Sequence, residues 1–182
     1  MLFITVEIIP ERYDEVKEEF IPAKTQTLQL EHSLVSISKW ESKWCKSFLH
    51  TSDKTYEETL DYIKCMTITQ NVKEEVYDRL TTGNVKQIKD YINAPMTATT
   101  FSKDRNAGKS GREIVTSELI YHWMIALNIP FECQKWHLNR LLTLIRVCEI
   151  KKSPPKKMSK KELMSRNAQL NAARRKQLNT KG

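Results

Sequence analysis

Glycine is scarce in this sequence, with only four glycines among 182 residues. Loops that cradle phosphates depend on glycine, because it lets the backbone approach the phosphate closely. The one candidate, Ala107-Gly-Lys-Ser110, lacks the first glycine of a Walker A motif, since Lys103 stands at that position. We therefore expect a solvated, mobile loop over residues 102–111 rather than a nucleotide site.

Long apolar runs are also absent. No stretch approaches the roughly 18 apolar residues that a membrane span needs, and the first residues lack the basic flank and cleavage site of a signal peptide. The four cysteines, at positions 45, 65, 133 and 148, have neither the close spacing of zinc knuckles nor the density of a disulfide scaffold. These features predict a soluble protein that is not exported and keeps its thiols reduced.

Residues with metal or catalytic chemistry are isolated from one another. Cys133 and His137 stand four apart on an expected helix, and His122 and Cys148 could complete a tetrahedral set, but the spacing matches no common zinc pattern. We expect these cysteines to be small buried side chains that pack in the core, and not metal ligands. No stretch presents a nucleophile on a sharp turn or a recognisable pair of acid and base. We expect no metal, no cofactor and no enzymatic activity.

Charge is distributed unevenly along the chain. Residues 1 to 150 contain 19 basic and 21 acidic side chains, whereas residues 151 to 182 contain 11 basic side chains and one acid, Glu162. The composition changes around Pro154-Pro155, which end a helix and stiffen the connector. The sequence therefore predicts one globular domain over 1–150, followed by a basic linker and helical arm over 151–182.

Two β-branched segments predict a small N-terminal sheet. They are residues 2–9, closed by Pro10, and residues 25–31, where apolar or small residues alternate with polar ones. These segments would pair as a hairpin or meander across a charged connection at residues 10–23. Residues 96–101 are a third and weaker extended candidate.

Capping residues and periodicity predict four short helices before residue 95. Ser33 can cap the first helix, and Thr55 with Glu58 forms a capping box for the second. Asn71 and Asn84 are the expected N-caps of helices over 71–80 and 84–93, with Gly83 as a helix stop between them.

Two longer helices are expected over residues 112–127 and 131–150. The short connection between them predicts an antiparallel hairpin, which we place at the centre of the core. The fold class is therefore α+β and predominantly helical. It comprises a small N-terminal β-hairpin or meander, a helical bundle with a central antiparallel helical hairpin, and an extended basic C-terminal arm.

The C-terminal arm has the most unusual physical property. Its 11 cations would bind a polyanion by counterion release, and an Ala- and Arg-rich helix can fold on contact. No aromatic residue follows Trp136, so a nucleic acid would be contacted through phosphates rather than by base stacking. We favour docking on an acidic patch of a neighbouring protein. The candidate partner-binding residues are Lys151, Lys152, Lys156, Lys157, Lys160, Lys161, Arg166, Arg174, Arg175 and Lys176.

Four stretches together resemble a family of small proteins encoded among the structural genes of tailed bacteriophages. They are LEHSLVSISKWES (30–42), TYEETLDYIK (55–64), IPFECQKWHLNRLL (129–142) and RNAQLNAARRKQLNTKG (166–182). The resemblance implies a virion component or a tail-assembly factor. We favour the tail or baseplate region as its location. Its partners would be other phage structural proteins, and several copies of it would occur in one assembly. A membrane is not among the expected partners. The location implied is the virion, or the host cytoplasm during assembly.

Two alternatives to a non-enzymatic structural or assembly protein remain. The first is a nucleic-acid-binding accessory protein, in which the same arm contacts phosphates. The second is a small enzyme whose site uses the region of Trp123, Trp136 and His137.

Overall fold

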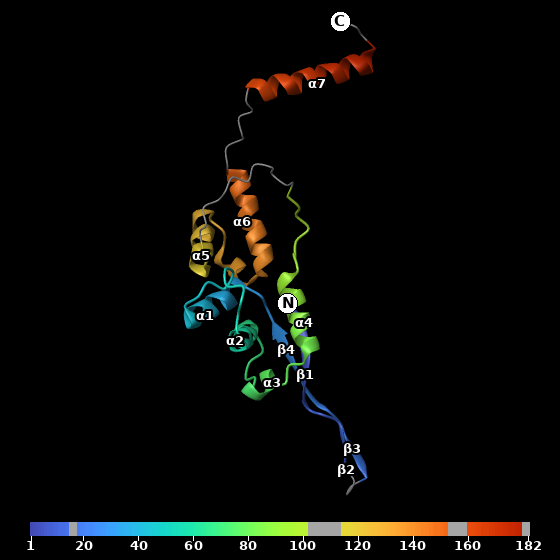
Figure 1. Ribbon diagram of the computed structural model, residues 1–182, viewed down its shortest axis with the longest axis vertical. Helices are drawn as coiled ribbons and strands as arrows, with labels where there is room; N and C mark the ends of the chain where they lie inside the picture. The colour runs from blue at the N-terminus through green and yellow to red at the C-terminus, as the bar shows by residue number, and fades with distance from the viewer. Residues whose placement is uncertain (15–17, 102–113, 153–159, 180–182) are drawn as a thin grey trace. The chain divides into compact units, whose positions relative to one another are not determined.

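The computed structural model describes residues 1–14, 18–101, 114–152 and 160–179 (Figure 1). The chain divides into an N-terminal unit, Met1–Glu149, and a C-terminal unit, Ile150–Gly182. The described residues form an α+β fold that is mostly helical, with small N-terminal antiparallel strand pairs. The elements are β1 (Leu2–Ile9), β2 (Arg12–Asp14), β3 (Glu19–Ile21), β4 (Lys24–Leu30), α1 (Leu34–Trp44), α2 (Tyr56–Met66), α3 (Glu74–Asp78), α4 (Thr82–Asn93), α5 (Ser117–Ala126), the 3-10 helix η1 (Phe131–Lys135), α6 (Leu138–Lys152) and α7 (Lys160–Leu178).

The first strand pair forms because two alternating segments bury the same face. β1 and β4 are antiparallel, with Ile4 opposite Leu28 and one register shift after Glu7. Successive side chains of a strand point to opposite faces, so Ile4, Val6, Leu28 and Leu30 are all buried. The two strands predicted from the sequence are thus confirmed, as is their hairpin pairing.

A second strand pair lies in the connection for which the sequence predicted no structure. β2 and β3 are antiparallel, with Tyr13 opposite Phe20. The two rings lie 4.9 Å apart, and such cross-strand aromatic pairs stabilise a ribbon. Both rings are exposed, so no alternation of buried and exposed residues marked these strands. Figure 1 shows this hairpin projecting from the helices of the N-terminal unit.

Helix α1 occupies the centre of the helical core. Ser33 and Thr55 cap α1 and α2 as predicted, each within a capping box. Ile37 and Trp40 of α1 are fully buried, and the Trp40 indole N–H donates to the carbonyl of Glu58 at 2.8 Å. Because α1 packs against α2, α5 and η1, it takes the central place that we expected for the two helices after residue 112.

Those two helices are shorter than predicted. α5 starts at Ser117 after its cap Thr116, and a 3-10 turn replaces the first part of the expected helix over 131–150. Trp136 has an extended backbone, so α6 begins only at Leu138. Both helices still contribute apolar side chains to the core, namely Ile120, Met124, Leu138, Leu141 and Ile145.

The predicted caps of α3 and α4 are wrong. Asn71 adopts a positive φ of 57°, and α3 begins only after Lys73. Thr81 caps α4, and Asn84 is the third helical residue of that capping box. Gly83 lies in the first turn of α4 and is not a helix stop. Threonine and asparagine are both favourable N-caps, so local sequence did not decide between them.

The third extended candidate, residues 96–101, forms no strand. Phe101 instead lies 4.1 Å below the guanidinium of Arg146 on α6. The expected mobile loop over 102–111, with Ala107-Gly-Lys-Ser110, and the connector Pro154-Pro155 lie outside the described residues.

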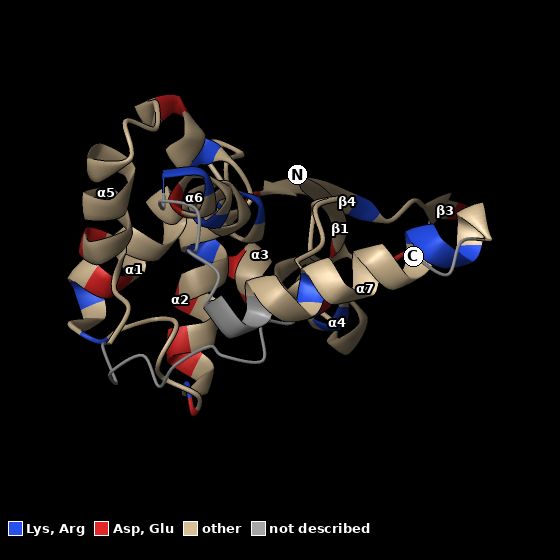
Figure 2. Cartoon of the chain, turned by 90° about the horizontal axis from the view of Figure 1, so that it is seen from above, with Lys and Arg blue, Asp and Glu red and all other residues tan. Residues whose placement is uncertain are grey.

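Helix α7 lies within residues 151–182, for which the sequence predicts a basic linker and a helical arm. Its described side chains, from position 163 onward, are all exposed. Lys and Arg recur along it (Figure 2).

A buried carboxylate connects three segments of the N-terminal unit. Glu41 on α1 is 7% exposed. Its Oε1 accepts the backbone N–H of Phe48 at 2.8 Å, and its Oε2 accepts that of Ser117 at 2.7 Å. The amides of a first helical turn have no partner within the helix, so Glu41 caps α5 from a distant part of the chain.

Removing this carboxylate should destabilise the fold. Glu41→Ala leaves two buried amides without acceptors, and we expect the free energy of unfolding to fall by about 2–4 kcal/mol. Glu41→Gln retains one acceptor oxygen, so its free energy of unfolding should fall by about half as much. Urea unfolding measures both effects, with Glu75→Ala on the exposed surface of α3 as a control. Equal stability of Glu41→Ala and the wild type would contradict this role.

Candidate functional site

Two of the predicted partner-binding residues lie at the end of α6. Lys151 and Lys152 are its last two residues and are exposed. Cations in the last turn complement the negative end of the helix dipole, so these lysines also stabilise α6. Lys156 and Lys157 lie outside the described residues.

The other six predicted residues belong to α7. Lys160 and Lys161 begin the helix. Successive helical residues turn by about 100°, so the remaining four point to different sides of the axis. α7 is therefore a cationic rod without a single basic face. The four exposed side chains are Arg166, Arg174, Arg175 and Lys176.

α7 also leaves its large apolar side chains uncovered. They are 45% to 70% exposed, whereas a helix of a globular domain normally buries an apolar stripe. Spacings of seven and eight residues place Leu163, Leu170 and Leu178 along one side of the helix. This side is available for contact with another surface. The exposed residues concerned are Leu163, Met164, Leu170 and Leu178.

The main cluster of titratable groups in the N-terminal unit is closed to solvent. His32 Nδ1 and the Tyr62 hydroxyl are hydrogen-bonded, and the rings of His32 and His137 lie 5.0 Å apart. His137 Nε2 lies 3.0 Å from the carbonyl oxygen of Tyr91, whose hydroxyl donates to Glu31 Oε1 at 2.6 Å. The cluster thereby connects the end of β4 with α2, α4 and the start of α6.

Burial favours the neutral forms of the two histidines and the two tyrosines of this cluster. Burial, together with the smaller effect of the neighbouring His137, lowers the pKa of His32 to about 3. Burial likewise lowers the pKa of His137, against the opposing effect of the Tyr91 carbonyl. The pKa values of Tyr62 and Tyr91 are raised, mainly by burial. No buried side-chain nitrogen or oxygen in the described residues lacks a hydrogen-bond partner, which indicates a structural role.

Acidification should destabilise the protein through His32. The unfolded chain protonates this histidine near pH 6.5 and the folded chain only near pH 3, so unfolding takes up a proton between these values. Stability is therefore fully present above pH 6.5 and falls by about 1.4 kcal/mol per pH unit below it, or about 2 kcal/mol at pH 5. Urea unfolding between pH 8 and pH 5 should show a smaller pH dependence for His32→Gln than for the wild type. The exposed His122→Gln is the control, and equal slopes for His32→Gln and wild type would refute the assignment.

Cys133 and His137 do not form the metal site considered above. Cys133 lies in η1, where burial raises the pKa of its thiol. His122 is exposed on α5, and Cys148 is partly buried on α6. Among the residues with described positions, no three His, Cys, Asp or Glu could jointly hold a metal ion. All four cysteines are free thiols.

The three residues of the enzyme alternative lie in separate surroundings. Trp123 lines a hollow of about 250 Å³ to which neither Trp136 nor His137 contributes. Trp136 lies 4.2 Å below the guanidinium of Arg140. His137 belongs to the buried cluster.

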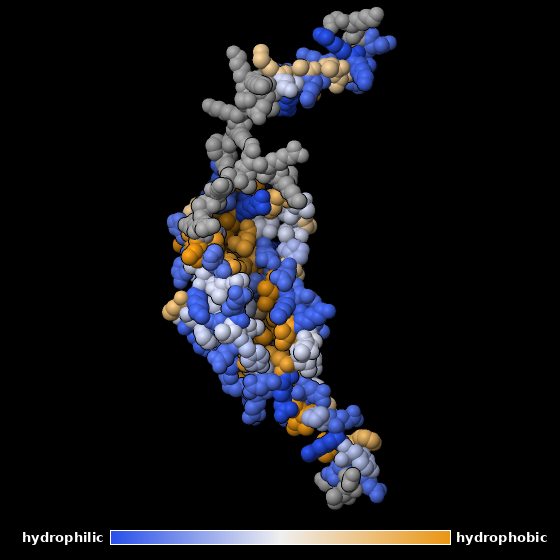
Figure 3. Space-filling model, in the orientation of Figure 1, coloured by the Kyte–Doolittle hydropathy of each residue, from blue (hydrophilic) through white to orange (hydrophobic). Residues whose placement is uncertain are grey.

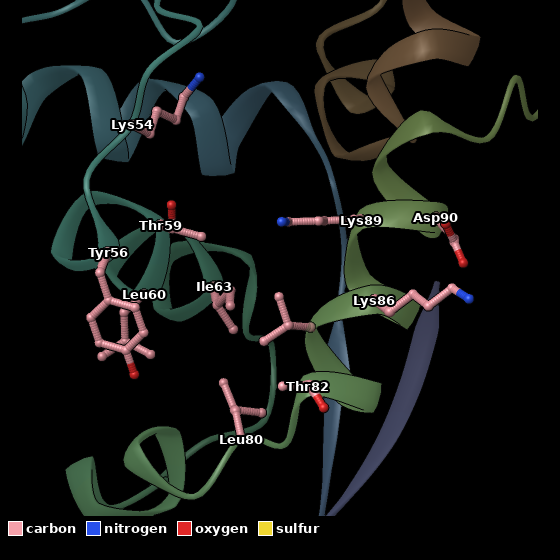
Figure 4. A pocket seen from close by; sticks show the side chains of 11 residues that line it. Lys54, Tyr56, Thr59, Leu60, Ile63, Leu80, Thr82, Lys86, Lys89 and Asp90 are labelled. Carbon is pink, nitrogen blue, oxygen red and sulfur yellow. The ribbon is translucent and has the colours of Figure 1, made fainter.

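A groove of about 600 Å³ lies between α2 and α4 (Figure 4). Tyr56, Leu60 and Ile63 line it from α2, and Leu80 and Val85 line the opposite side. Its volume lies within the range of ligand pockets, which are mainly apolar with a few polar groups. We call it the α2–α4 groove.

Three lysines border the α2–α4 groove. The Lys54 ammonium donates to the carbonyl of Phe48 at 2.7 Å and is thus already engaged. Lys86 and Lys89 are exposed on α4, and Figure 4 shows Lys89 extending toward α2. Asp90 is the one acid that lines the groove. An apolar group flanked by carboxylates would suit this combination.

The sequence analysis did not identify the α2–α4 groove. The available signal was the helical spacing of Leu60 and Ile63 on α2 and of Lys86 and Lys89 on α4. That signal assigns each side chain to its own helix. It does not show that the two helices lie opposite each other.

No protein-family model, curated protein or solved structure matches this chain. Within the part of the chain whose structure is described, no helix is both long and apolar enough to cross a membrane.

Proposed function

We propose that this protein is a non-enzymatic structural or assembly component of a tailed-phage virion, in the tail or baseplate region. Its basic C-terminal segment docks on neighbouring subunits. The observation that carries this proposal is the cationic helix α7, whose described side chains are all exposed and which belongs to a compact unit of its own. The likeness of the four sequence stretches supports the phage assignment.

The leucines of α7 favour a protein partner. Charge increases the rate of encounter, whereas buried apolar contacts slow dissociation. Leu163, Leu170 and Leu178 lie along one side of the helix and are exposed. A helix that presents such a row fits an apolar groove on another protein. Binding to phosphates alone would leave these leucines unused.

A nucleic-acid-binding accessory protein is the second candidate. It is supported by the spread of Arg166, Arg174, Arg175 and Lys176 around the axis of α7. A helix with cations on all sides can contact phosphates of both strands of a groove, and such contacts carry no base specificity.

Charge removal on α7 tests the docking proposal. Arg174→Gln, Arg175→Gln and Lys176→Gln together should reduce incorporation of the protein into phage particles at least tenfold, measured as copies per purified particle. The matched control replaces three neutral polar residues of the same helix, Gln169, Asn171 and Gln177, by alanine and should incorporate normally. Normal incorporation of the triple Gln variant would overturn the role of the arm.

Two further measurements separate the candidates. Leu170→Ser with Leu178→Ser should impair incorporation if the partner is a protein, and should leave DNA binding unchanged. Tight binding to random duplex DNA that weakens steeply with salt and is lost in the triple Gln variant would favour the nucleic-acid candidate instead. Absence of the protein from purified particles, together with normal assembly without it, would contradict a structural role.

A further inference from the structure

The β2–β3 hairpin exposes two large aromatic side chains on its strands. Phe20 is 71% exposed and Tyr13 is 49% exposed. Figure 3 shows hydrophobic surface among hydrophilic residues at this end of the N-terminal unit. β2 and β3 mainly contact each other, so among the described residues of the N-terminal unit no helix covers the two rings. Paired exposed aromatic residues of this kind are typical of interaction sites.

Acidic residues lie close to this aromatic pair in the sequence. Residues 10–23 contain five acidic and two basic side chains. Glu18 and Glu19 directly precede Phe20 and are exposed, as is Glu11 before β2. The aromatic pair therefore belongs to a negatively charged segment of the chain.

The α2–α4 groove has the complementary properties. Its walls are formed by apolar side chains of α2 and α4, and its volume of about 600 Å³ leaves room for an aromatic ring. Lys86 and Lys89 stand on its α4 side and are exposed, and Figure 4 shows that Lys89 extends toward α2 whereas Lys86 is directed away from it. Apolar character and charge thus match between two different surfaces of the same chain.

We propose that the β2–β3 hairpin of one copy inserts Phe20 into the α2–α4 groove of a second copy, where Glu18 and Glu19 meet Lys89. The apolar contact supplies affinity, and the charges fix orientation and increase the rate of association. The contact lies within the N-terminal unit and does not depend on the proposed function of α7.

This contact is heterologous, because hairpin and groove are different surfaces. Each copy can give its hairpin to one neighbour and receive the hairpin of another. Repetition of such a contact yields a ring if the rotation closes and a filament if it does not.

Sedimentation velocity of the full-length protein tests the proposal. At low salt the wild type should form oligomers larger than dimers as its concentration rises, and added salt should weaken them. Phe20→Ser and Lys89→Glu should each weaken association at least tenfold. The matched controls are Phe131→Ser and Lys135→Glu at exposed positions of η1, which should associate like the wild type. Circular dichroism and urea midpoints should show that all four variants are folded.

Mixing the two variants identifies a heterologous contact. The Phe20→Ser variant keeps its groove and the Lys89→Glu variant keeps its hairpin, so the mixture should form one-to-one dimers and nothing larger. Charge exchange provides a second check, since Glu19→Lys combined with Lys89→Glu should restore association that each single change weakens.

Several outcomes would overturn the proposal. They are a wild type that stays monomeric at all concentrations, association that neither variant weakens, and a mixture of the two variants that forms no dimer. The triple Gln variant of α7 separates this proposal from the proposed function. It should self-associate like the wild type, and loss of self-association in this variant would assign the contact to α7 instead of the hairpin.

Discussion

The buried carboxylate of Glu41 is the contact on which the arrangement of the N-terminal unit depends. It joins α1 to the loop at Phe48 and to the start of α5, two segments that no local sequence signal brings together. A second carboxylate acts similarly on the other side of α1, where Glu58 accepts the Thr55 amide at 2.8 Å and the Lys46 ammonium at 2.6 Å. With these amides satisfied, the apolar faces of α1, α2 and α5 can pack without leaving buried donors unpaired.

Polar contacts also fix α4, which forms the second wall of the α2–α4 groove. The Asn139 side-chain amide on α6 donates to the carbonyls of Ile92 and Ala94 at 3.1 and 2.8 Å. His137 lies within hydrogen-bond distance of the Tyr91 carbonyl. The carbonyls at a helix C-terminus have no partner within the helix, so α6 satisfies those of α4. These contacts to Asn139 and His137 therefore hold the α4 wall of the groove in place.

The sequence predicted the elements whose signals are local. The alternation in residues 2–9 and 25–31 and the caps Ser33 and Thr55 identified β1, β4, α1 and α2. The prediction failed where tertiary contacts decide. One helix was expected over residues 131–150, but Trp136 has an extended backbone and α6 starts after it, at Leu138. The hairpin of β2 and β3 has no buried face, so no pattern revealed it. The groove depends on how two helices meet, which periodicity does not encode.

The even distribution of cations around α7 has a consequence for how that helix associates. Attraction between a uniformly charged cylinder and a negative surface changes little when the cylinder spins about its own axis. As far as charge is concerned, many rotational settings of α7 are then close in energy. If α7 docks on neighbouring subunits as proposed, charge would draw the helix in at any of these settings, and the row of Leu163, Leu170 and Leu178 would select the one in which it is held.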